Sequence, residues 1–387
     1  MFITHVKVKN WRNFRKAEFD LTQPVSYLIG PNASGKSNLI DVFRFLRDIA
    51  KPRGGGLQQA VAERGGLASL RCGYVKQDSD VRIEITLSDA LHGPHEIWRY
   101  GLGFRAVGGA AIDRVLVTFE LVQQGDNPPF VSRPDQEDEN DPPLLTETHL
   151  EQTRANAKFR SIADTFANVG YLHVVPQLIK HGEDIGGNRL EGDPFGQGLV
   201  DRIANTPRER REIYLGSISD ALRIAAPGLG RLTFRFDPAG RQHIYAVGEN
   251  GRVRKTWQSE EGFSDGTLRL IGILWSLLEG KGLLLIEEPE LSLHNAVVEQ
   301  LPALIARAQR DAKHKRQVII STHSEAMLSN PGIDAGAVIR LVPSKEGSEL
   351  VPPTDAEVAA LKAGFSVAEA VLPNTRPKGV EQLSLWQ

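Results

Sequence analysis

The segment that most constrains the fold of this chain is residues 30–37, a glycine-bounded loop between an apolar run and a helical pattern. It reads Gly-Pro-Asn-Ala-Ser-Gly-Lys-Ser, which fits the phosphate-loop pattern G-x-x-x-x-G-K-[ST] at every specified position. The apolar run 25–29 precedes it, and residues 37–49 carry apolar side chains spaced by three and four. A strand, a glycine-rich loop and a helix in this order predict an α/β fold that binds a phosphate chain.

Phosphate chemistry gives the polar members of this loop their expected roles. The glycines let the backbone wrap closely, so that successive N–H groups converge on phosphate oxygens. Lys36 is expected to reach the β- and γ-phosphates of ATP, and Ser37 to hold Mg²⁺. The alternative, a chance match in a turn, does not explain the flanking strand and helix. The candidate ATP-binding residues are Gly30, Pro31, Asn32, Ala33, Ser34, Gly35, Lys36, Ser37 and Asn38.

A second candidate segment is the unbroken apolar run 283–286, which ends in two carboxylates, Glu287 and Glu288. A central strand of an open α/β sheet delivers its carboxyl end to the ligand. Glu287 is therefore expected to hold Mg²⁺ through its water shell, and Glu288 to orient or deprotonate the attacking water. The alternative is a solvated acidic turn before Pro289.

Two further polar segments accompany these motifs. The tetrapeptide Ser264, Asp265, Gly266 and Thr267 opens a helix upstream of the acidic strand, and a helix N-terminus can bind a γ-phosphate. An ordinary helix cap is the alternative reading of the same residues. His323 ends the next apolar strand, where an imidazole can contact the γ-phosphate, although a lone histidine is more often structural.

The order of these motifs resembles that of the ATP-binding-cassette ATPases. The strings N-W-R-N-F-R, G-P-N-A-S-G-K-S-N, S-D-G-T-L-R, E-E-P-E-L-S-L-H and S-T-H-S are similar to those of the RecF/SMC-related branch. Within it, the chain looks nearest to stand-alone "AAA family ATPase" proteins of the AAA_21 or AAA_15 type, which are grouped with the OLD family. The resemblance covers residues 1–50 and 260–330.

This resemblance implies an ABC-type P-loop ATPase head of the α/β class. Its mixed or parallel core sheet would be flanked by helices and joined by an antiparallel β-subdomain and a short helical subdomain. Two ATPs would be sandwiched in a head-to-head homodimer, each between the phosphate loop of one chain and Ser264 and Gly266 of the other. By motif position the resemblance implies catalytic roles for Lys36, Glu288 and His323, metal ligation by Ser37, Gln177 and Glu287, a trans signature at 264–267, and nucleotide contacts by Asn13 and Arg15.

Three departures from the family pattern concern residues around the expected metal and signature. Glu287 stands where aspartate is usual, the signature reads Ser-Asp-Gly-Thr, and His294 stands where transporter-type cassettes have an aspartate. The lysine, the second carboxylate and the strand-terminal histidine are all present. We therefore expect the chain to hydrolyse ATP.

The remaining patterns give a coarse plan of a single ATPase head over residues 1–387. We expect lobes at 1–175, 176–262 and 263–345 and a tail at 346–387; the first lobe would carry a β-rich insert at about 50–165 with a flexible acidic loop at about 133–145. Strands are expected at 81–85, 115–119 and 169–175, and residues Phe2, Thr4, Val6 and Val8 on one strand face. Helices are expected at 199–226 and about 295–312, with a hairpin at 232–247.

Composition limits the compartment and the partners of the chain. A net charge of −2 over 387 residues gives no global attraction to nucleic acid or anionic membranes. The single cysteine, Cys72, cannot form an internal disulfide. The first nine residues lack a signal-peptide run, and no stretch reaches about 18 apolar residues. We expect a cytoplasmic protein without a membrane partner.

The sequence leaves three main functions open, and a fourth that is weaker. The few acidic residues after His323 form no Toprim-like cluster, so we expect no nuclease activity in this chain itself. The first function is an ATPase switch controlling a separate effector, a nuclease or toxin in a bacterial defence system. The second is a RecF-like maintenance ATPase that binds nucleic acid, and the third an ATP-binding scaffold with negligible turnover. A transporter subunit is a weaker fourth alternative.

Overall fold

The computed structural model describes residues 1–75, 80–91, 96–106, 114–185, 189–248, 257–311 and 316–375. The chain divides into two compact units. Unit 1 consists of Met1–Val169, Gln317–His323 and Asp334–Gln387, and unit 2 consists of Gly170–Arg316 and Ser324–Ile333. Each unit has its own buried apolar core.

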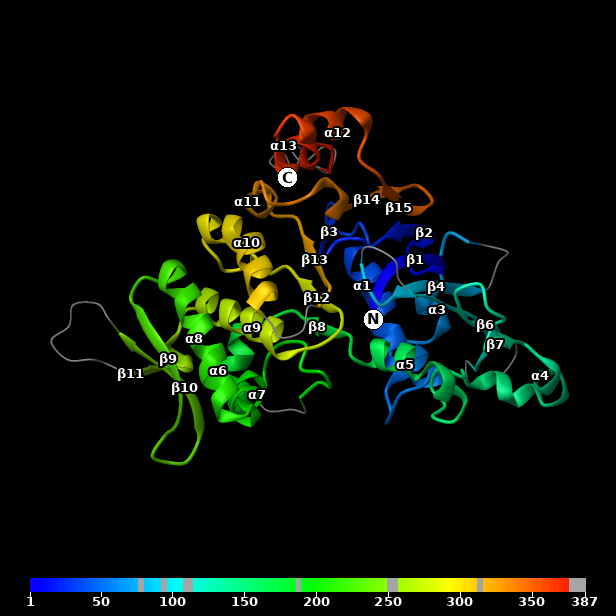
Figure 1. Cartoon of the computed structure of the whole chain (residues 1–387), viewed down its shortest axis with the longest axis horizontal. Helices are drawn as coiled ribbons and strands as arrows, with labels where there is room; N and C mark the ends of the chain where they lie inside the picture. Colours follow the sequence, from blue (N-terminus) through cyan, green and yellow to red (C-terminus); the bar gives the residue numbers. More distant parts are fainter. Residues whose placement is uncertain are drawn as a thin grey trace, which may run out of the picture. The chain divides into compact units, whose positions relative to one another are not determined.

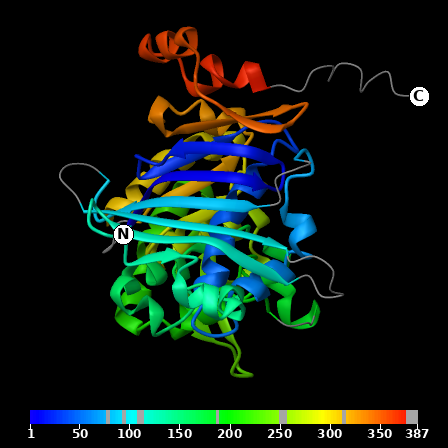
Figure 2. The ribbon, with the colours of Figure 1, turned by 90° about the vertical axis from the view of Figure 1, so that its right-hand side faces the viewer.

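An antiparallel sheet forms one layer of unit 1 (Figure 2, blue to cyan strands). Its strands, in the order β2-β1-β4-β5-β6-β7, are β2 (Phe14–Asp20), β1 (Phe2–Trp11), β4 (Val81–Ser88), β5 (Ile97–Ala106), β6 (Val115–Gln124) and β7 (Val131–Arg133). In β4 the alternating residues Val81, Ile83 and Ile85 are buried, as the period-two pattern predicts.

The alternation predicted for the first strand is partly wrong. The pairing of β1 with β4 shifts register between Ile3 and His5, so that Ile3 is buried with Val6 and Val8. Phe2 and Thr4 are only half-buried. A bulge of this kind inserts one residue and changes which side chains face the core.

Unit 1 also contains four strands in the order β15-β14-β3-β13. Their bounds are β15 (Gly347–Val351), β14 (Val338–Ser344), β3 (Val25–Ile29) and β13 (Val318–Thr322). The strand β3 is parallel to both neighbours, and β15 is antiparallel to β14. Four of the five residues of β3 and all five of β13 are buried, which explains why both read as continuous apolar runs.

The helix α1 (Lys36–Ala50) follows β3 and packs its apolar stripe into the core of unit 1. Phe45 on this helix contacts Trp11 edge-on at 5.2 Å between ring centroids and stacks on Phe104 at 5.4 Å. The indole Nε1 of Trp11 donates a hydrogen bond to the Asn38 carbonyl oxygen at 2.8 Å. The aromatic cluster thereby fixes the first turn of α1, where the phosphate loop ends.

The remaining helices of unit 1 are short: α2 (Leu57–Ala62), α3 (Leu67–Leu70), α4 (Gln136–Asn140), α5 (Arg160–Ala167), α12 (Asp355–Lys362) and α13 (Val367–Ala370). The expectation of a flexible acidic loop at about 133–145 is wrong, because α4 lies there with a capping box at Asp135 and Asp138. Asp138 is 3% exposed and pairs with Arg133 at 2.6 Å, so this segment is fixed by a buried ion pair.

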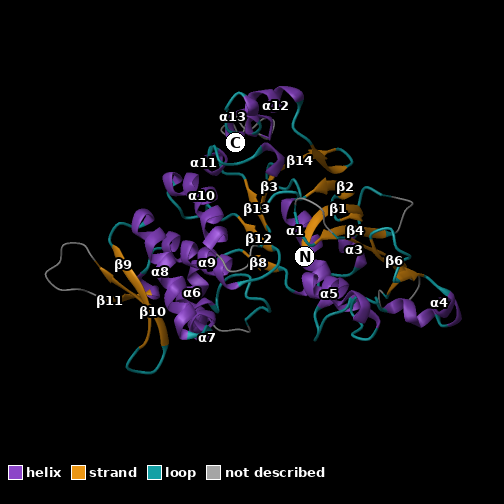
Figure 3. Cartoon of the chain, viewed as in Figure 1, coloured by secondary structure: helices purple, strands orange, loops and turns teal. Residues whose placement is uncertain are grey.

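Unit 2 is mainly helical (Figure 3). Its helices are α6 (Pro176–Ile185), α7 (Leu199–Asn205), α8 (Arg208–Ala225), α9 (Asp265–Glu279), α10 (Asn295–Asp311) and α11 (Glu325–Leu328). Two strands, β8 (Gly170–Leu172) and β12 (Leu284–Glu287), pair in parallel. A separate antiparallel sheet contains β11 (Trp257–Ser259), β10 (Gln242–Gly248) and β9 (Leu229–Phe236), with β9 beside α8 (Figure 1).

Two predictions in unit 2 need correction. The helix expected over 199–226 is broken after α7, because Thr206 precedes Pro207 and is extended at ψ 135°. The strand expected over 169–175 is limited to β8. Beyond it, the backbone N–H groups of His173 and Val175 bond to the carbonyls of Pro194 and Phe195.

Two other predictions for unit 2 are confirmed. The hairpin predicted at 232–247 forms between β9 and β10, and the helix predicted at about 295–312 is α10, with Pro302 inside it.

Among the helices that the structure describes, none is long and apolar enough to cross a membrane.

Candidate functional site

The phosphate loop of unit 1 has a backbone that only glycine fits at its two ends. Gly30 has φ 154° and Gly35 has φ 94°. A Cβ at Gly30 would lie 2.5 Å from the Leu341 carbonyl oxygen, and one at Gly35 would lie 2.4 Å from the amide nitrogen of Asn13. Both positions are therefore closed to larger residues, as the tight loop between β3 and α1 requires.

The side chains of this loop are arranged around its backbone. The Lys36 ammonium donates hydrogen bonds to the carbonyl oxygens of Gly30, at 2.8 Å, and Pro31, at 3.0 Å, and the residue is 8% exposed. The buried hydroxyl of Ser34 makes no hydrogen bond with any described residue. Ser37 lies in the first turn of α1 and is exposed. A held cation, an unsatisfied hydroxyl and a helix N-terminus fit a bound polyphosphate.

Asn13 and Arg15, predicted at the nucleotide or its flank, lie beside the loop in unit 1. Asn13 accepts a hydrogen bond from the Asn38 amide at 2.8 Å and donates one to the Ser348 hydroxyl at 2.6 Å. It therefore links the first turn of α1 to β15. Arg15 pairs with Glu346 at the surface. The sequence suggested none of these three partners.

His323 directly follows β13 and is exposed. In the parallel pairing of β13 with β3, Thr322 lies opposite Ile29. His323 and Gly30 are therefore the next residues on two neighbouring strands, and adjacent strands lie about 4.8 Å apart. The fold of unit 1 brings this histidine to the edge of the sheet that carries the phosphate loop.

In unit 2 the two carboxylates stand at the carboxyl end of β12. Glu287 accepts a hydrogen bond from the Tyr171 hydroxyl at 2.6 Å through Oε2. Its other oxygen, Oε1, is buried and has no hydrogen-bond partner among the described residues. A carboxylate that is oriented through one oxygen and bare at the other fits a metal ion or a metal-bound water.

Glu288 has an unusual backbone conformation. Its φ is 45°, in the left-handed region that glutamate rarely adopts. A residue held in this region costs about 1–3 kcal/mol, and such residues cluster at functional sites. The half-buried side chain of Glu288 is thus directed by a strained turn immediately after the strand.

The signature segment caps α9. The Ser264 hydroxyl accepts a hydrogen bond from the Thr267 backbone N–H at 3.2 Å and lies 2.8 Å from the Thr267 hydroxyl. Gly266 is required by close packing, because a Cβ there would lie 2.7 Å from the Ser292 carbonyl oxygen in the turn after β12. The start of α9 and the turn that follows Glu288 are therefore packed together within unit 2.

Gln177 and Asp265 lie together in this unit. The Gln177 amide donates to Asp265 at 2.6 Å, and the Lys180 ammonium pairs with the same carboxylate at 2.8 Å. The hydrogen bond from Lys180 lowers the pKa of Asp265. The structure places Gln177, predicted in the Mg²⁺ shell, against the signature segment.

The segments that carry this site also match a known protein family. Residues 25–329 match the family model AAA_21, described as "AAA domain, putative AbiEii toxin, Type IV TA system". The chain belongs to this family. The AAA_21 match includes the phosphate loop, the acidic strand β12, the signature and His323.

Curated relatives of this AAA_21 protein carry the name "DNA replication and repair protein RecF". The relative from Roseiflexus castenholzii is 32% identical over 94 residues, which is 22% of this chain and 24% of the relative. The relative from Bacillus thuringiensis is 27% identical over 88 residues, again 24% of its length. The chain therefore matches about a quarter of the length of these relatives.

The solved structure titled "Crystal structure of the SmcHead bound to the C-winged helix domain of ScpA" has the same fold. It superposes with a TM-score of 0.54 at 16% identity, covering 91% of this chain and 98% of that one. The predicted ABC-type head and the resemblance to RecF and SMC proteins are thereby confirmed. The AAA_21 chain thus has the fold of an SMC head and is similar in sequence to RecF proteins over about a quarter of their length.

Two residues of the AAA_21 site were not predicted. Tyr171 bonds Glu287 from the neighbouring strand. Arg269 on α9 is 5% exposed, burial lowers its pKa, and the carboxylates of Glu290, Asp265 and Glu288 act against that shift. The sequence signals only their positions, in a predicted strand and one turn into a capped helix. The pairing of β8 with β12 decides the contact between Tyr171 and Glu287.

Proposed function

We propose that this chain is an ATP-hydrolysing switch that forms a head-to-head homodimer around two Mg²⁺-ATP and thereby controls a separate effector protein. The observation that carries the proposal is the exposed Ser264 at the N-terminus of the 15-residue helix α9. A helix start of this length attracts an anion. The segment that starts with Ser264 resembles the signature of cassette ATPases. The expected anion is therefore the γ-phosphate of an ATP bound by a second chain.

In the proposed site, the phosphate loop binds the triphosphate. Backbone N–H groups at the start of α1 and the Lys36 ammonium hold the phosphate oxygens. Mg²⁺, when bound, neutralises charge on the β- and γ-phosphates. Ser37 and the bare oxygen of Glu287 would hold it, with Gln177 in its outer shell.

The proposed hydrolytic step uses the carboxylate that follows β12. Glu288 orients the attacking water and accepts its proton, and His323 contacts the γ-phosphate. The strained backbone of Glu288 supports this role, because strain fixes the direction of the side chain. In the proposed dimer, Ser264 and Gly266 donate hydrogen bonds to the γ-phosphate from the partner chain.

Steady-state phosphate release tests the catalytic part of the proposal. Glu288→Gln removes the proton acceptor, and its turnover is expected to fall about 10²- to 10⁴-fold while ATP binding persists. The matched control is Glu299→Gln, at an exposed position of α10. Turnover of Glu288→Gln equal to that of the control would contradict the assignment. Negligible wild-type turnover would favour an ATP-binding scaffold.

The proposed output is control of a nuclease or toxin in bacterial anti-phage defence within the cytoplasm. The family description, which includes a toxin of a toxin–antitoxin system, supports an output of this kind. Co-expression with the neighbouring genes is expected to yield a partner that co-purifies with wild type but not with Lys36→Ala. Recovery of no neighbouring gene product would contradict effector control.

A second candidate is a RecF-like ATPase of DNA replication or repair. The local likeness to proteins of that name favours it. This function predicts that DNA raises the ATP turnover of the wild type, with a response that weakens as salt rises. The effector function predicts that the partner protein, instead, changes turnover.

A further inference from the structure

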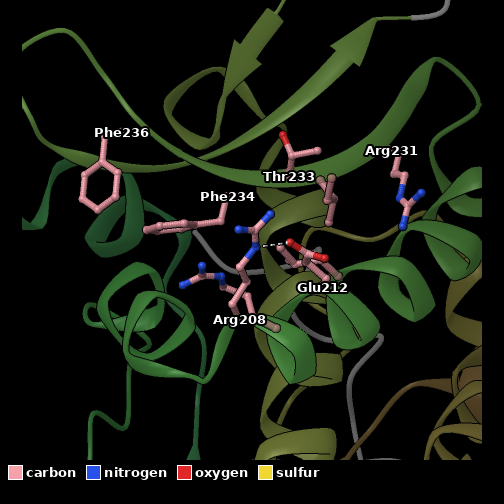
Figure 4. Close-up of a pocket in the computed structure, with 9 residues that line it drawn as sticks. Arg208, Glu212, Arg231, Thr233, Phe234 and Phe236 are labelled. Atoms are coloured by element: carbon pink, nitrogen blue, oxygen red, sulfur yellow. Dashed lines mark hydrogen bonds and ion pairs between the residues drawn. The ribbon is translucent and has the colours of Figure 1, made fainter.

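A second binding feature lies on α8 and β9 of unit 2, where the sequence suggests no role for any residue. Nine residues line a pocket there of about 450 Å³. Pockets for small ligands are about 300–1,000 Å³. The lining includes Arg208 and Arg211 from α8 and Arg231, Phe234 and Phe236 from β9 (Figure 4).

The charge of the pocket favours an anion, because three arginines face a single acidic residue, Glu212. Arg208 pairs with Glu212 at 2.9 Å, but the two side chains are 83% and 61% exposed. Exposed ion pairs between residues four apart on a helix contribute little free energy. A phosphate can therefore replace Glu212 as the partner of Arg208. Arg231 is exposed and makes no hydrogen bond or ion pair with any residue that the structure describes.

The same pocket carries aromatic rings at its side. The guanidinium of Arg211 lies 4.3 Å from the ring centroid of Phe234, and it also bonds the Ala204 carbonyl oxygen at 2.8 Å. Phe236 meets Phe234 edge-on at 5.4 Å and is 63% exposed. In Figure 4, Arg208 lies between Phe236 on one side and Arg231 on the other. The exposed ring of Phe236 therefore lines the same pocket as the three arginines and contacts Phe234, over which Arg211 lies.

We propose that this pocket binds single-stranded nucleic acid, with phosphates on Arg208 and Arg231 and an unpaired base stacked on Phe236. Proteins usually bind a single strand with cationic side chains along its phosphate backbone and with exposed aromatic rings on which its bases stack. Duplex bases are already stacked on one another and cannot use the ring. All lining residues belong to one unit of one chain, so this binding rests on neither ATP hydrolysis nor dimerisation.

Fluorescence anisotropy with a labelled oligothymidylate of about 15 nucleotides tests the proposal, since single-strand sites span about 4–16 nucleotides per fold. An oligoribonucleotide and a duplex of equal length complete the set, all measured without ATP. Wild type is expected to bind one or both single strands more tightly than the duplex. Weak binding to all three probes, or tighter binding to the duplex, would overturn the proposal.

The variants separate phosphate contacts from stacking. Arg208→Gln combined with Arg231→Gln is expected to weaken binding and to reduce the slope of log affinity against log salt by about 1.4, or about 0.7 per contact. Phe236→Ala is expected to weaken binding about tenfold or more at an unchanged salt slope. An affinity of Phe236→Ala equal to wild type would overturn the stacking role.

Matched controls lie outside the pocket. Arg223→Gln changes an arginine on the same helix α8 that is 71% exposed and paired with Asp220. Phe365→Ala changes a phenylalanine of unit 1 that is 55% exposed. Both are expected to bind as wild type does. Equal losses in the controls and the pocket variants, at unchanged circular dichroism, would show non-specific attraction and overturn the proposal.

Discussion

Lys36 is a buried cation that donates hydrogen bonds to carbonyl oxygens of its own loop. Its ammonium bonds the carbonyls of Gly30 and Pro31 and is shielded from solvent. Carbonyl dipoles satisfy an ammonium less strongly than ionised phosphate does, because charge-assisted hydrogen bonds are about twice as strong as neutral ones. The loop therefore holds the lysine in place for an anionic ligand.

We predict that Lys36→Ala loses ATP binding and, with it, at least about 99% of ATP turnover, a loss of the size seen when one stabilising donor is removed. A fluorescent ATP analogue measures the binding, and phosphate release measures the turnover. Lys16→Ala is the control, because Lys16 pairs with Glu18 at the surface. Retained ATP binding in Lys36→Ala would contradict the role given to the loop.

The site residues differ in how far the sequence could predict them. The phosphate loop follows from eight consecutive residues, because its backbone conformation depends on local glycines. Tyr171 could not be predicted as the partner of Glu287, since 116 residues separate them and only the pairing of β8 with β12 brings them together. The burial of Arg269, which lowers its pKa, likewise follows from the fold and not from a local pattern.

At the scale of single elements, α4 shows how a buried ion pair can order an acidic segment. The Arg133 guanidinium bonds Asp138 and also Glu120, which is fully buried. Hydrogen bonding from Arg133 lowers the pKa of Asp138, whereas burial raises the pKa of Glu120. The acidic composition of this segment predicted a mobile loop. The prediction failed because it took no account of Arg133, which lies on the edge strand β7 and fixes α4.

We predict that Asp138→Asn is less stable than wild type by about 1.5–3 kcal/mol at pH 7, the usual contribution of a hydrogen bond to a charged group. A lowered pKa in the folded state adds stability above the ordinary aspartate pKa of 3.8, and this stability is lost as the pH falls through the folded pKa. The difference between the two proteins, measured by urea unfolding, should therefore shrink below about pH 4.

The control for this prediction is Asp164→Asn, at an exposed position of α5. It should be as stable as wild type at pH 7. A constant difference between Asp138→Asn and wild type from pH 7 to pH 3 would show that the ion pair with Arg133 is not the cause.

The helix α9 depends on Ser264 both for its cap and for its proposed contact with a second chain. Replacement of a serine cap costs about 1 kcal/mol, which is small beside the stability of a folded protein. The cap can therefore be altered without unfolding unit 2. The proposed contact across the dimer should be more sensitive to substitution of Ser264 than the cap is. A bulky side chain at this position would clash with the nucleotide bound by the partner.

We predict that Ser264→Arg in the Glu288→Gln background binds ATP but remains monomeric. Ser264→Thr in the same background keeps a capping hydroxyl and should still dimerise. Sedimentation velocity with ATP and Mg²⁺ distinguishes the two. Dimers of equal amount in both variants would rule out a role for Ser264 across the interface.

Several elements were predictable because their signals are local. The helix α1 follows the phosphate loop with apolar residues at helical spacing, and the hairpin of β9 and β10 turns at Pro238-Ala239-Gly240. The break between α7 and α8 was missed although Pro207 marks it. The bulge near Ile3 could not be read from alternation, because it depends on pairing with β4.

In our proposal, the residues that bind and hydrolyse ATP come from both units of the chain. Unit 1 carries the phosphate loop and His323, and unit 2 carries Glu287, Glu288 and the signature segment. In this proposal, the phosphate loop of unit 1 is enough to bind ATP. Hydrolysis also needs the carboxylates of unit 2 and the signature segment of a second chain. An assembly that forms only with ATP can report the nucleotide state to a partner.

The mass of Glu288→Gln in solution tests this proposal most directly. With ATP and Mg²⁺, size exclusion with light scattering should give twice the monomer mass. Without nucleotide, and in Lys36→Ala/Glu288→Gln with ATP, it should give the monomer mass. A Glu288→Gln protein that binds ATP and yet keeps the monomer mass at every protein concentration would contradict the ATP-sandwiched dimer.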